Sequence, residues 1–154
     1  MTINEALTKA MKLCSVKEYA PSEIEQKLRT WELPDEAVYS IIKTLTEEKF
    51  LDEFRMARYF VNDKIRFNKW GRVKIKFMLQ QKKLAPEAIT EALTQVNEEK
   101  YLETLLNELV KKKKTMKDTD EYKIKAKLFQ FASGRGFEAD IIYKIVLQSK
   151  FISC

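Results

Sequence analysis

Histidine is absent from this 154-residue chain, and cysteine occurs only twice. Histidine is the most common general base of enzymes and the most common zinc ligand. Cys14 and Cys154 lie far apart in the sequence and do not form the paired spacing of a zinc site. The side chains needed for acid–base catalysis or for a structural zinc ion are therefore lacking. We expect a protein that is not an enzyme and that holds no metal or other cofactor.

The same two cysteines give no disulfide framework, which predicts a reducing, cytoplasmic location. Residues 1–11, MTINEALTKAM, contain neither the basic nor the apolar segment of a signal peptide. No apolar run approaches the roughly 20 residues that a membrane-spanning helix needs. We therefore expect no contact with a membrane.

Glycine and proline are also scarce, with three of each. Sheet proteins need many tight turns, whereas Leu, Lys, Glu, Ala and Gln, which dominate here, favour helices. Gly134 and Gly136 resemble part of a phosphate-binding loop, but no strand precedes them and the Gly-Lys-Ser/Thr ending is missing. We interpret them as a helix stop followed by a helix start. The sequence thus predicts an all-α protein.

Three landmarks recur with a period of about fifty residues. An aromatic residue followed by an apolar one occurs at Phe50-Leu51, Tyr101-Leu102 and Phe151-Ile152. Apolar or small residues five positions apart occur upstream, at Leu28 and Leu33, Leu79 and Leu84, and Ala132 and Phe137. A helix start rich in Pro, Asp or Glu follows each of these pairs. This self-similarity predicts three tandem repeats, at residues 1–51, 52–102 and 103–154.

Each repeat is expected to contain three helices. The expected helices are 4–14, one from Ser22 and one from Pro34, then 52–67, 72–83 and 86–99, and finally 103–114, 121–133 and 138–149. Ser22 and Glu25 have the spacing of a capping box, Asp52 is a candidate N-cap, and 115–120 is a polar linker. One bundle of three short helices buries little surface, so neighbouring repeats are expected to stack as an elongated, gently curved array.

Positive charge is concentrated in one part of the chain. The net charge is +6, yet residues 1–50 hold seven basic and nine acidic side chains. Residues 51–100 and 101–154 each hold eleven basic and seven acidic ones, and segment 55–83 holds ten Lys or Arg against Asp63 alone. A face that serves only solubility normally mixes both signs. Segment 55–83 therefore predicts a binding surface for a polyanion or an acidic protein.

The predicted partner-binding residues lie on the polar side of this segment and in the third repeat. They are Arg55, Arg58, Tyr59, Arg66, Lys69, Arg72, Lys76, Lys83, Lys123 and Lys127. Tyr59 and Trp70 have rings that bases could stack on, although Trp70 fits equally well as a packing anchor. Lys111–Lys114 fits a solubilising run as well as a binding site. The apolar arc of helix 52–67 is predicted to comprise Phe54, Met56, Ala57, Phe60, Val61, Ile65 and Phe67.

The order and spacing of these residues resemble the RecX family. The middle repeat matches through Leu51-Asp52-Glu53-Phe54, Ala57, Phe60, Val61, Trp70-Gly71, Ile75, Leu79, Lys82 and Leu84. The third repeat matches through Arg135-Gly136-Phe137, Ile141 and Ile142. Two positions depart from the pattern, because Lys83 stands where the family favours glycine and Thr30-Trp31-Glu32 replaces glycine in the first repeat. The loss of such a helix-capping glycine costs about 1 kcal/mol, which the fold tolerates.

The resemblance implies a regulator of the RecA recombinase. Such proteins dock into the groove of the RecA filament on single-stranded DNA, limit filament growth and reduce recombinase activity, which modulates DNA repair and the SOS response. We expect a monomer that binds the RecA filament and acts without catalysis. The alternative is a protein that binds single- or double-stranded DNA by itself through phosphate contacts. Reversal of Arg55, Arg58, Arg72 and Lys76 to glutamate is expected to abolish inhibition and preserve the helices.

Overall fold

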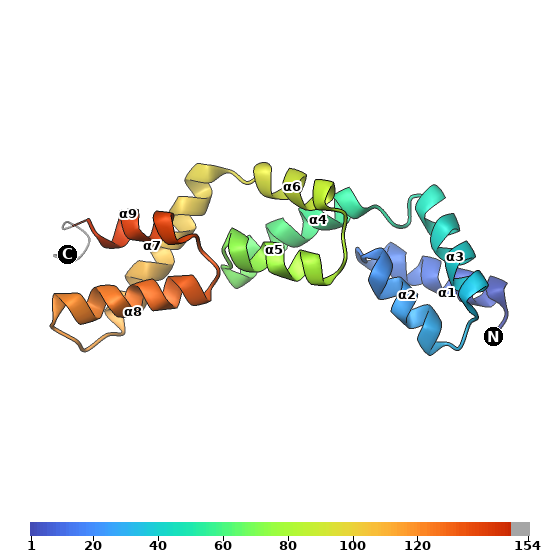
Figure 1. Ribbon diagram of the computed structural model, residues 1–154, viewed down its shortest axis with the longest axis horizontal. Coiled ribbons are helices and arrows are strands. Elements are labelled where there is room, and N and C mark those ends of the chain that lie inside the picture. Colours follow the sequence, from blue (N-terminus) through green and yellow to red (C-terminus); the bar gives the residue numbers. More distant parts are fainter. Residues whose placement is uncertain (149–154) are drawn as a thin grey trace. The chain divides into compact units, whose positions relative to one another are not determined.

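The computed structural model describes residues 1–148. Within this range the chain forms nine α-helices and one π-helical segment, and it contains no strand (Figure 1). The helices are α1 (Ile3–Val16), α2 (Pro21–Thr30), α3 (Asp35–Glu47), α4 (Glu53–Asp63), α5 (Arg72–Gln81), α6 (Pro86–Thr94), α7 (Glu98–Lys114), α8 (Glu121–Gly134) and α9 (Ala139–Val146). The π-helical segment η1 (Lys64–Asn68) directly follows α4. The predicted all-α class with tandem helical repeats is confirmed.

The chain divides into two compact units. The N-terminal unit comprises Met1–Phe60 and Met78–Thr94, and the C-terminal unit comprises Val61–Phe77 and the described residues from Gln95 onward. The predicted middle repeat contributes residues to both units, so its candidate binding residues are also divided between them.

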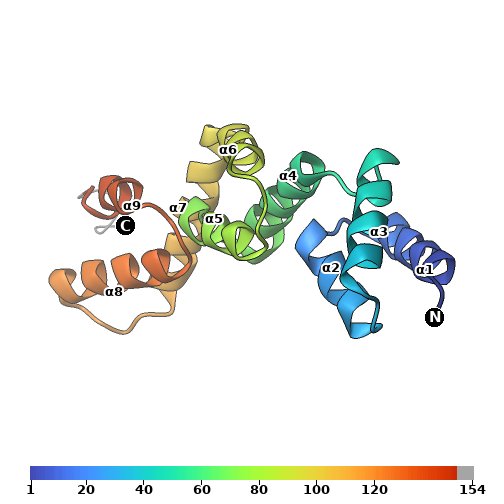
Figure 2. The same cartoon turned by 45° about the vertical axis from the view of Figure 1, so that its right-hand side comes forward.

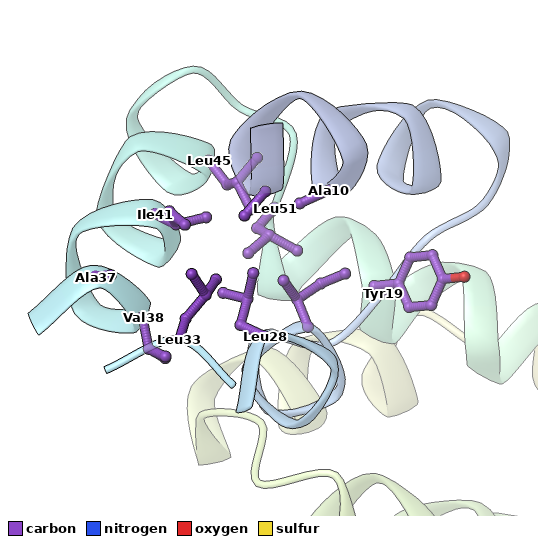
Figure 3. Close-up of a cluster of buried hydrophobic side chains, with 11 residues drawn as sticks. Ala10, Tyr19, Leu28, Leu33, Ala37, Val38, Ile41, Leu45 and Leu51 are labelled. Atoms are coloured by element: carbon purple, nitrogen blue, oxygen red, sulfur yellow. The ribbon is translucent and has the colours of Figure 1, made fainter. Parts of the chain in front are cut away.

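In the N-terminal unit, α1, α2 and α3 pack around one apolar core. Side chains from all three helices and from their connections point toward one another, as the close-up in Figure 3 shows. Leu28, Ile41 and Leu45 are at most 1% exposed. Burial of one such side chain stabilises the fold by about 1.5–3 kcal/mol. Cys14 packs against this core, and burial together with the nearby Glu18 carboxylate raises the pKa of its thiol.

A short turn joins the second and third helices of every repeat (Figures 1 and 2). The hydrogen bonding of this turn is the same in all three repeats. The second residue of each five-apart pair donates its amide to the carbonyl of the first. The N···O distances are 3.3 Å for Leu33 and Leu28, 3.5 Å for Leu84 and Leu79, and 3.2 Å for Phe137 and Ala132. This six-to-one bond defines a Schellman motif, in which the two residues also approach through their side chains. The five-residue spacing found in the sequence is therefore the signature of a helix C-cap.

The residue inside each of these turns has a left-handed backbone. Glu32, Lys83 and Gly136 have φ angles of 63°, 59° and 92°. Only glycine adopts such a conformation without a steric cost. Glu32 and Lys83 stand where the family pattern has glycine, and the structure keeps the same turn with the non-glycine residues in place.

The predicted start of α2 is wrong. Pro21 occupies the first helical position, where its missing N–H costs nothing. The carboxylate of Glu23 accepts a hydrogen bond from the amide of Ala20 at 2.8 Å. Ser22 does not cap the helix, because its Oγ donates to the carbonyl of Lys82 at 2.6 Å. Asp52, in contrast, caps α4 as predicted, with its Oδ1 accepting from the amide of Arg55 at 3.1 Å.

The predicted bounds of α6 and α7 also differ from the structure. The expected helix 86–99 ends at Thr94, and α7 begins at Glu98 rather than at 103. Asn97 caps α7 by accepting a hydrogen bond from the amide of Lys100 at 3.0 Å. Tyr101-Leu102, taken as the end of a repeat, therefore lies inside a helix. The last helix ends at Val146, and its predicted end at 149, Phe151-Ile152 and Cys154 lie outside the described residues.

The apolar arc predicted for helix 52–67, which the structure forms as α4 and η1, is wrong at its two ends. Met56, Ala57, Phe60 and Val61 are at most 6% exposed, as expected, but Phe54 is 38% and Phe67 is 69% exposed. Helix α4 continues as the π-helical segment η1 instead of an α-helix. A π-turn contains an extra residue, so the side chains that follow rotate away from their α-helical positions. This change of helix type turns Phe67 toward solvent.

Candidate partner-binding surface

In the N-terminal unit, two of the predicted binding residues form ion pairs with the unit itself. Arg55 Nε lies 2.8 Å from Glu18 Oε1, and Arg58 Nη1 lies 2.5 Å from Glu91 Oε1. The first pair joins α4 to the connection between α1 and α2, and the second joins α4 to α6. The hydrogen bond that Arg55 donates to the Glu18 carboxylate raises the pKa of Arg55, although partial burial lowers it. Both arginines thus hold α4 in place, although their side chains remain about two-fifths exposed, at 39% and 41%.

Tyr59 and Lys83 are the more accessible predicted residues of this unit. Tyr59 is 49% exposed, and Lys83 makes no ion pair with any residue of the described range. Lys83 borders a groove of about 730 Å³ between α2 and the end of α5. The groove also contains Glu23 and Glu25, so its walls carry both signs of charge. A groove of mixed charge gives little preference for an anion.

In the C-terminal unit, Arg72 belongs to a network of side chains around Tyr101. Its guanidinium lies 4.1 Å from the centre of the Tyr101 ring, pairs with Glu98, and donates to Glu138 Oε2 at 2.8 Å. The Tyr101 hydroxyl donates to Glu138 and accepts from the amide of Arg72 at 2.9 Å. Burial lowers the pKa of Arg72, but the hydrogen bonds that it donates to Glu98 and Glu138 outweigh this effect and raise the pKa.

Backbone atoms complete this contact. The amide of Gly71 donates to the carbonyl of Arg135 at 2.8 Å, and the amide of Val73 donates to the carbonyl of Gly136 at 2.9 Å. Together with the Tyr101 hydroxyl, these carbonyls satisfy the first amides of α5, which have no partner within the helix. The Schellman turn after α8 therefore caps α5. The side chain of Arg72 is only 19% exposed. It therefore stabilises this contact and is not available to bind a partner.

Arg66 and Lys69 lie together in a pocket of about 570 Å³ with Lys100, a residue that the sequence did not single out. We call this the basic pocket. Its wall also includes Asn62, Asn97 and Thr104, and none of its lining residues carries a carboxylate. Lys69 Nζ donates to the backbone carbonyl of Arg66 at 2.6 Å, which fixes the Lys69 ammonium at the end of η1. Three cations without an acid make a site for phosphate or carboxylate groups.

The remaining predicted residues lie on helices α5 and α8. Lys76 is exposed and makes no ion pair with another described residue, whereas Lys127 Nζ lies 2.7 Å from Asp118 Oδ2. The hydrogen bond from Lys127 lowers the pKa of Asp118. Lys123 is exposed on α8, in the same helix as Lys127. These two lysines are not among the residues that line the basic pocket.

Trp70 is covered by cations of its own unit. The ammonium groups of Lys74 and Lys64 lie 4.4 Å and 5.3 Å from its ring centre. This arrangement favours the packing interpretation of Trp70 over base stacking. Part of the positive charge of segment 55–83 therefore has a role within the fold, because Lys74 and Lys64 contact the Trp70 ring.

Five of the predicted cations have acidic or aromatic partners among the described residues, namely Arg55, Arg58, Arg66, Arg72 and Lys127. The charge-reversal variant predicted from the sequence therefore needs correction. Replacement of Arg55, Arg58 and Arg72 by glutamate would place carboxylates beside Glu18, Glu91 and Glu138. Such a variant is expected to unfold in part, so it cannot test binding.

Within residues 1–148, no three His, Cys, Asp or Glu side chains are grouped to hold a metal ion, and no helix has the length and apolarity to cross a membrane.

Fold and sequence comparisons place the chain among proteins built from tandem three-helix domains. The family model for the second three-helix domain of RecX matches residues 52–93, and that for the third matches residues 98–146. The crystal structure of RecX from Lactobacillus salivarius has a TM-score of 0.85, with 20% identity, over 95% of this chain and 94% of that one.

The curated relatives carry the same family name. The regulatory protein RecX of Acinetobacter baylyi is 31% identical over 137 residues, which cover 89% of this chain and 83% of that protein. The regulatory protein RecX of Clostridium acetobutylicum is 34% identical over 119 residues, which cover 75% of this chain but only 55% of that protein. The chain therefore belongs to the RecX family of regulatory proteins, and it spans a little over half the length of some of its relatives.

Proposed function

We propose that this protein is a non-enzymatic regulator that binds the RecA filament on single-stranded DNA. By doing so it limits filament growth and recombinase activity, and it thereby modulates DNA repair and the SOS response in the cytoplasm. Membership of the RecX family supports the regulatory role. The basic pocket supports the binding mode, because Arg66, Lys69 and Lys100 face a common space without an acid.

The filament offers two kinds of anion to such a pocket, namely DNA phosphates and carboxylates of the protein. Direct binding to DNA without RecA is the alternative function. A pocket lined without carboxylates supports this alternative as much as it supports binding to the filament. The two functions differ in their requirements. A filament regulator needs RecA and acts at fewer than one copy per RecA subunit. A DNA-binding protein needs no RecA, and its affinity falls steeply with salt.

The test compares a pocket variant with a control of the same charge change. The pocket variant is Arg66→Gln with Lys69→Gln and Lys100→Gln, and the control is Lys111→Gln with Lys114→Gln and Lys117→Gln. All six side chains lie on the C-terminal unit, and each variant loses three positive charges. Readouts are inhibition of the ATPase of RecA from the same organism, filament length by electron microscopy, and single-stranded DNA binding without RecA.

We expect wild-type protein and the control to shorten filaments and to inhibit the ATPase. The pocket variant should need about tenfold more protein or more for the same effect, as expected for the loss of three charge-assisted contacts. Inhibition of equal strength by the pocket variant would exclude the basic pocket as the contact. If wild-type protein leaves filaments unchanged but binds DNA with a salt dependence that the pocket variant weakens, direct DNA binding replaces filament regulation.

A further inference from the structure

The outward side of α5 carries apolar residues that the core does not use. Val73 and Phe77 are each 57% exposed, and both belong to the C-terminal unit. They are four residues apart, so they are neighbours on the same side of the helix. Ile75, on the inner side, is completely buried. Arg72, Lys76 and Lys83 of this segment were predicted as binding residues, whereas the apolar pair Val73 and Phe77 was not.

Lys76 lies next to Phe77 in the sequence and three residues after Val73, so the same side of the helix also carries a positive charge. We call Val73, Lys76 and Phe77 the outer face of α5. Lys76 is exposed and makes no ion pair with any residue up to 148. Segment 61–77 as a whole contains six Lys or Arg and one acid, Asp63. Exposed aromatic side chains are enriched in protein-binding sites, and a cation beside one can pair with an acidic group of the partner.

The chemistry of this face distinguishes between the two components of a nucleoprotein filament. Phosphate groups are recognised by cations and hydrogen-bond donors and gain nothing from the two methyl groups of Val73. A base can stack on Phe77, but it cannot stack on the valine one turn earlier. An apolar side chain of a protein can cover both residues, and carboxylates beside it can pair with Lys76.

We infer that the outer face of α5 docks a segment of the partner protein that presents an apolar side chain flanked by carboxylates. This inference rests on the proposed function and assigns to α5 the contact with the protein component of the filament. The basic pocket and the outer face of α5 then have different targets: the pocket takes anionic groups, and the outer face takes an apolar anchor. Loss of the apolar pair should weaken binding to the filament without weakening binding to DNA.

The experiment uses the full chain with Val73→Ser and Phe77→Ser. Because both residues are exposed, circular dichroism and the melting temperature are expected to stay close to those of the wild type. The matched control is Tyr39→Ser with Tyr122→Ser, which removes two other exposed apolar rings, 73% and 79% exposed, from α3 and α8. Readouts are inhibition of the RecA ATPase and binding to single-stranded DNA in the absence of RecA.

We expect the α5 variant to need at least about tenfold more protein for half-maximal inhibition, with DNA binding within about twofold of wild type, as for loss of a central apolar anchor. The control should inhibit like wild type. Equal inhibition by wild type and the α5 variant would overturn this inference and leave the proposed function intact. A parallel loss of DNA binding would show that the face contacts nucleic acid and would also overturn it. Absence of inhibition by wild-type protein would overturn the proposed function and this inference with it.

Discussion

A Cβ atom on Gly71 would lie 2.3 Å from the carbonyl oxygen of Gly136. No side chain fits between atoms at that distance, so the start of α5 and the turn after α8 meet backbone to backbone. The hydrogen bond from the Gly71 amide to the Arg135 carbonyl, at 2.8 Å, forms at the same place. Gly71 is therefore required for space rather than for an unusual backbone angle.

Gly71→Ala is expected to lower the free energy of unfolding by about 3 kcal/mol, because the methyl group pushes two backbones apart and breaks their hydrogen bonds. The matched control is Gly134→Ala. Gly134 ends α8 with nothing within 4 Å of the position of its Cβ, and alanine favours helix, so stability should rise by up to about 1 kcal/mol. Urea denaturation followed by circular dichroism measures both. Similar stabilities of the two variants would contradict the close contact.

Lys83→Gly should stabilise the protein by about 0.5–1 kcal/mol, because glycine removes the strain of a left-handed backbone but makes the unfolded chain more flexible. Lys83→Ala is the control, since it removes the same charge and keeps the Cβ atom that causes the strain. Thermal melting distinguishes them. If the Lys83→Ala protein is as stable as the Lys83→Gly protein, the charge of the lysine side chain destabilises the wild type, and the φ angle of 59° does not.

Arg72→Gln is expected to lower the free energy of unfolding by about 1–2 kcal/mol through the loss of its hydrogen bonds to Glu98 and Glu138. A double-mutant cycle with Glu138→Gln should give a coupling energy of about 1 kcal/mol. Arg66→Gln, in the basic pocket, serves as the comparison and should change stability by no more than about 0.5 kcal/mol. A coupling energy near zero would mean that Arg72 and Glu138 do not act together in solution.

Stability should fall at alkaline pH in a way that depends on Tyr101. Burial and the hydrogen bond to Glu138 raise the pKa of Tyr101 above its ordinary value of 10.0. The unfolded chain then releases this proton at a lower pH than the folded chain does. The stabilisation is complete below about pH 10 and is lost as the pH rises toward the folded-state pKa.

Tyr101→Phe isolates this effect from the titration of the other tyrosines and of the lysines. Phenylalanine has no proton to release, so the difference in unfolding free energy between wild type and the variant should stay constant up to about pH 10 and shrink above it. Urea denaturation at several pH values measures it. A difference that does not change with pH would show that Tyr101 titrates alike in the folded and unfolded chains.

The sequence predicts the architecture well, because the fold depends on local patterns. Leu28 and Leu33 have a spacing that the Schellman turn requires, and Asp52 precedes α4 as a capping residue does. The wrong boundaries have local causes too. Pro21 takes the first position of α2 ahead of Ser22, and Asn97 starts α7 before Tyr101. Both signals are in the sequence, but they compete with others of similar strength.

The binding surface is predicted less well, because charge in a sequence does not show where its partner lies. Arg58 is 33 residues from Glu91, and the pair forms only when α4 and α6 meet. Lys100 follows two glutamates in the sequence, which hides its place in an acid-free pocket. Phe67 follows an apolar pattern that the change to a π-helix interrupts. These contacts depend on tertiary packing and helix type, which periodicity does not reveal.

The Schellman turns have a consequence for how the length of such a chain can change. Each repeat ends its second helix with hydrogen bonds between its own residues, at Leu33, Leu84 and Phe137. A duplicated repeat would therefore bring with it the hydrogen bonds that end its second helix. Gain or loss of a whole repeat would leave these turns intact, whereas insertion of a residue between Leu28 and Leu33, or between their counterparts, would break the hydrogen bond that defines the turn.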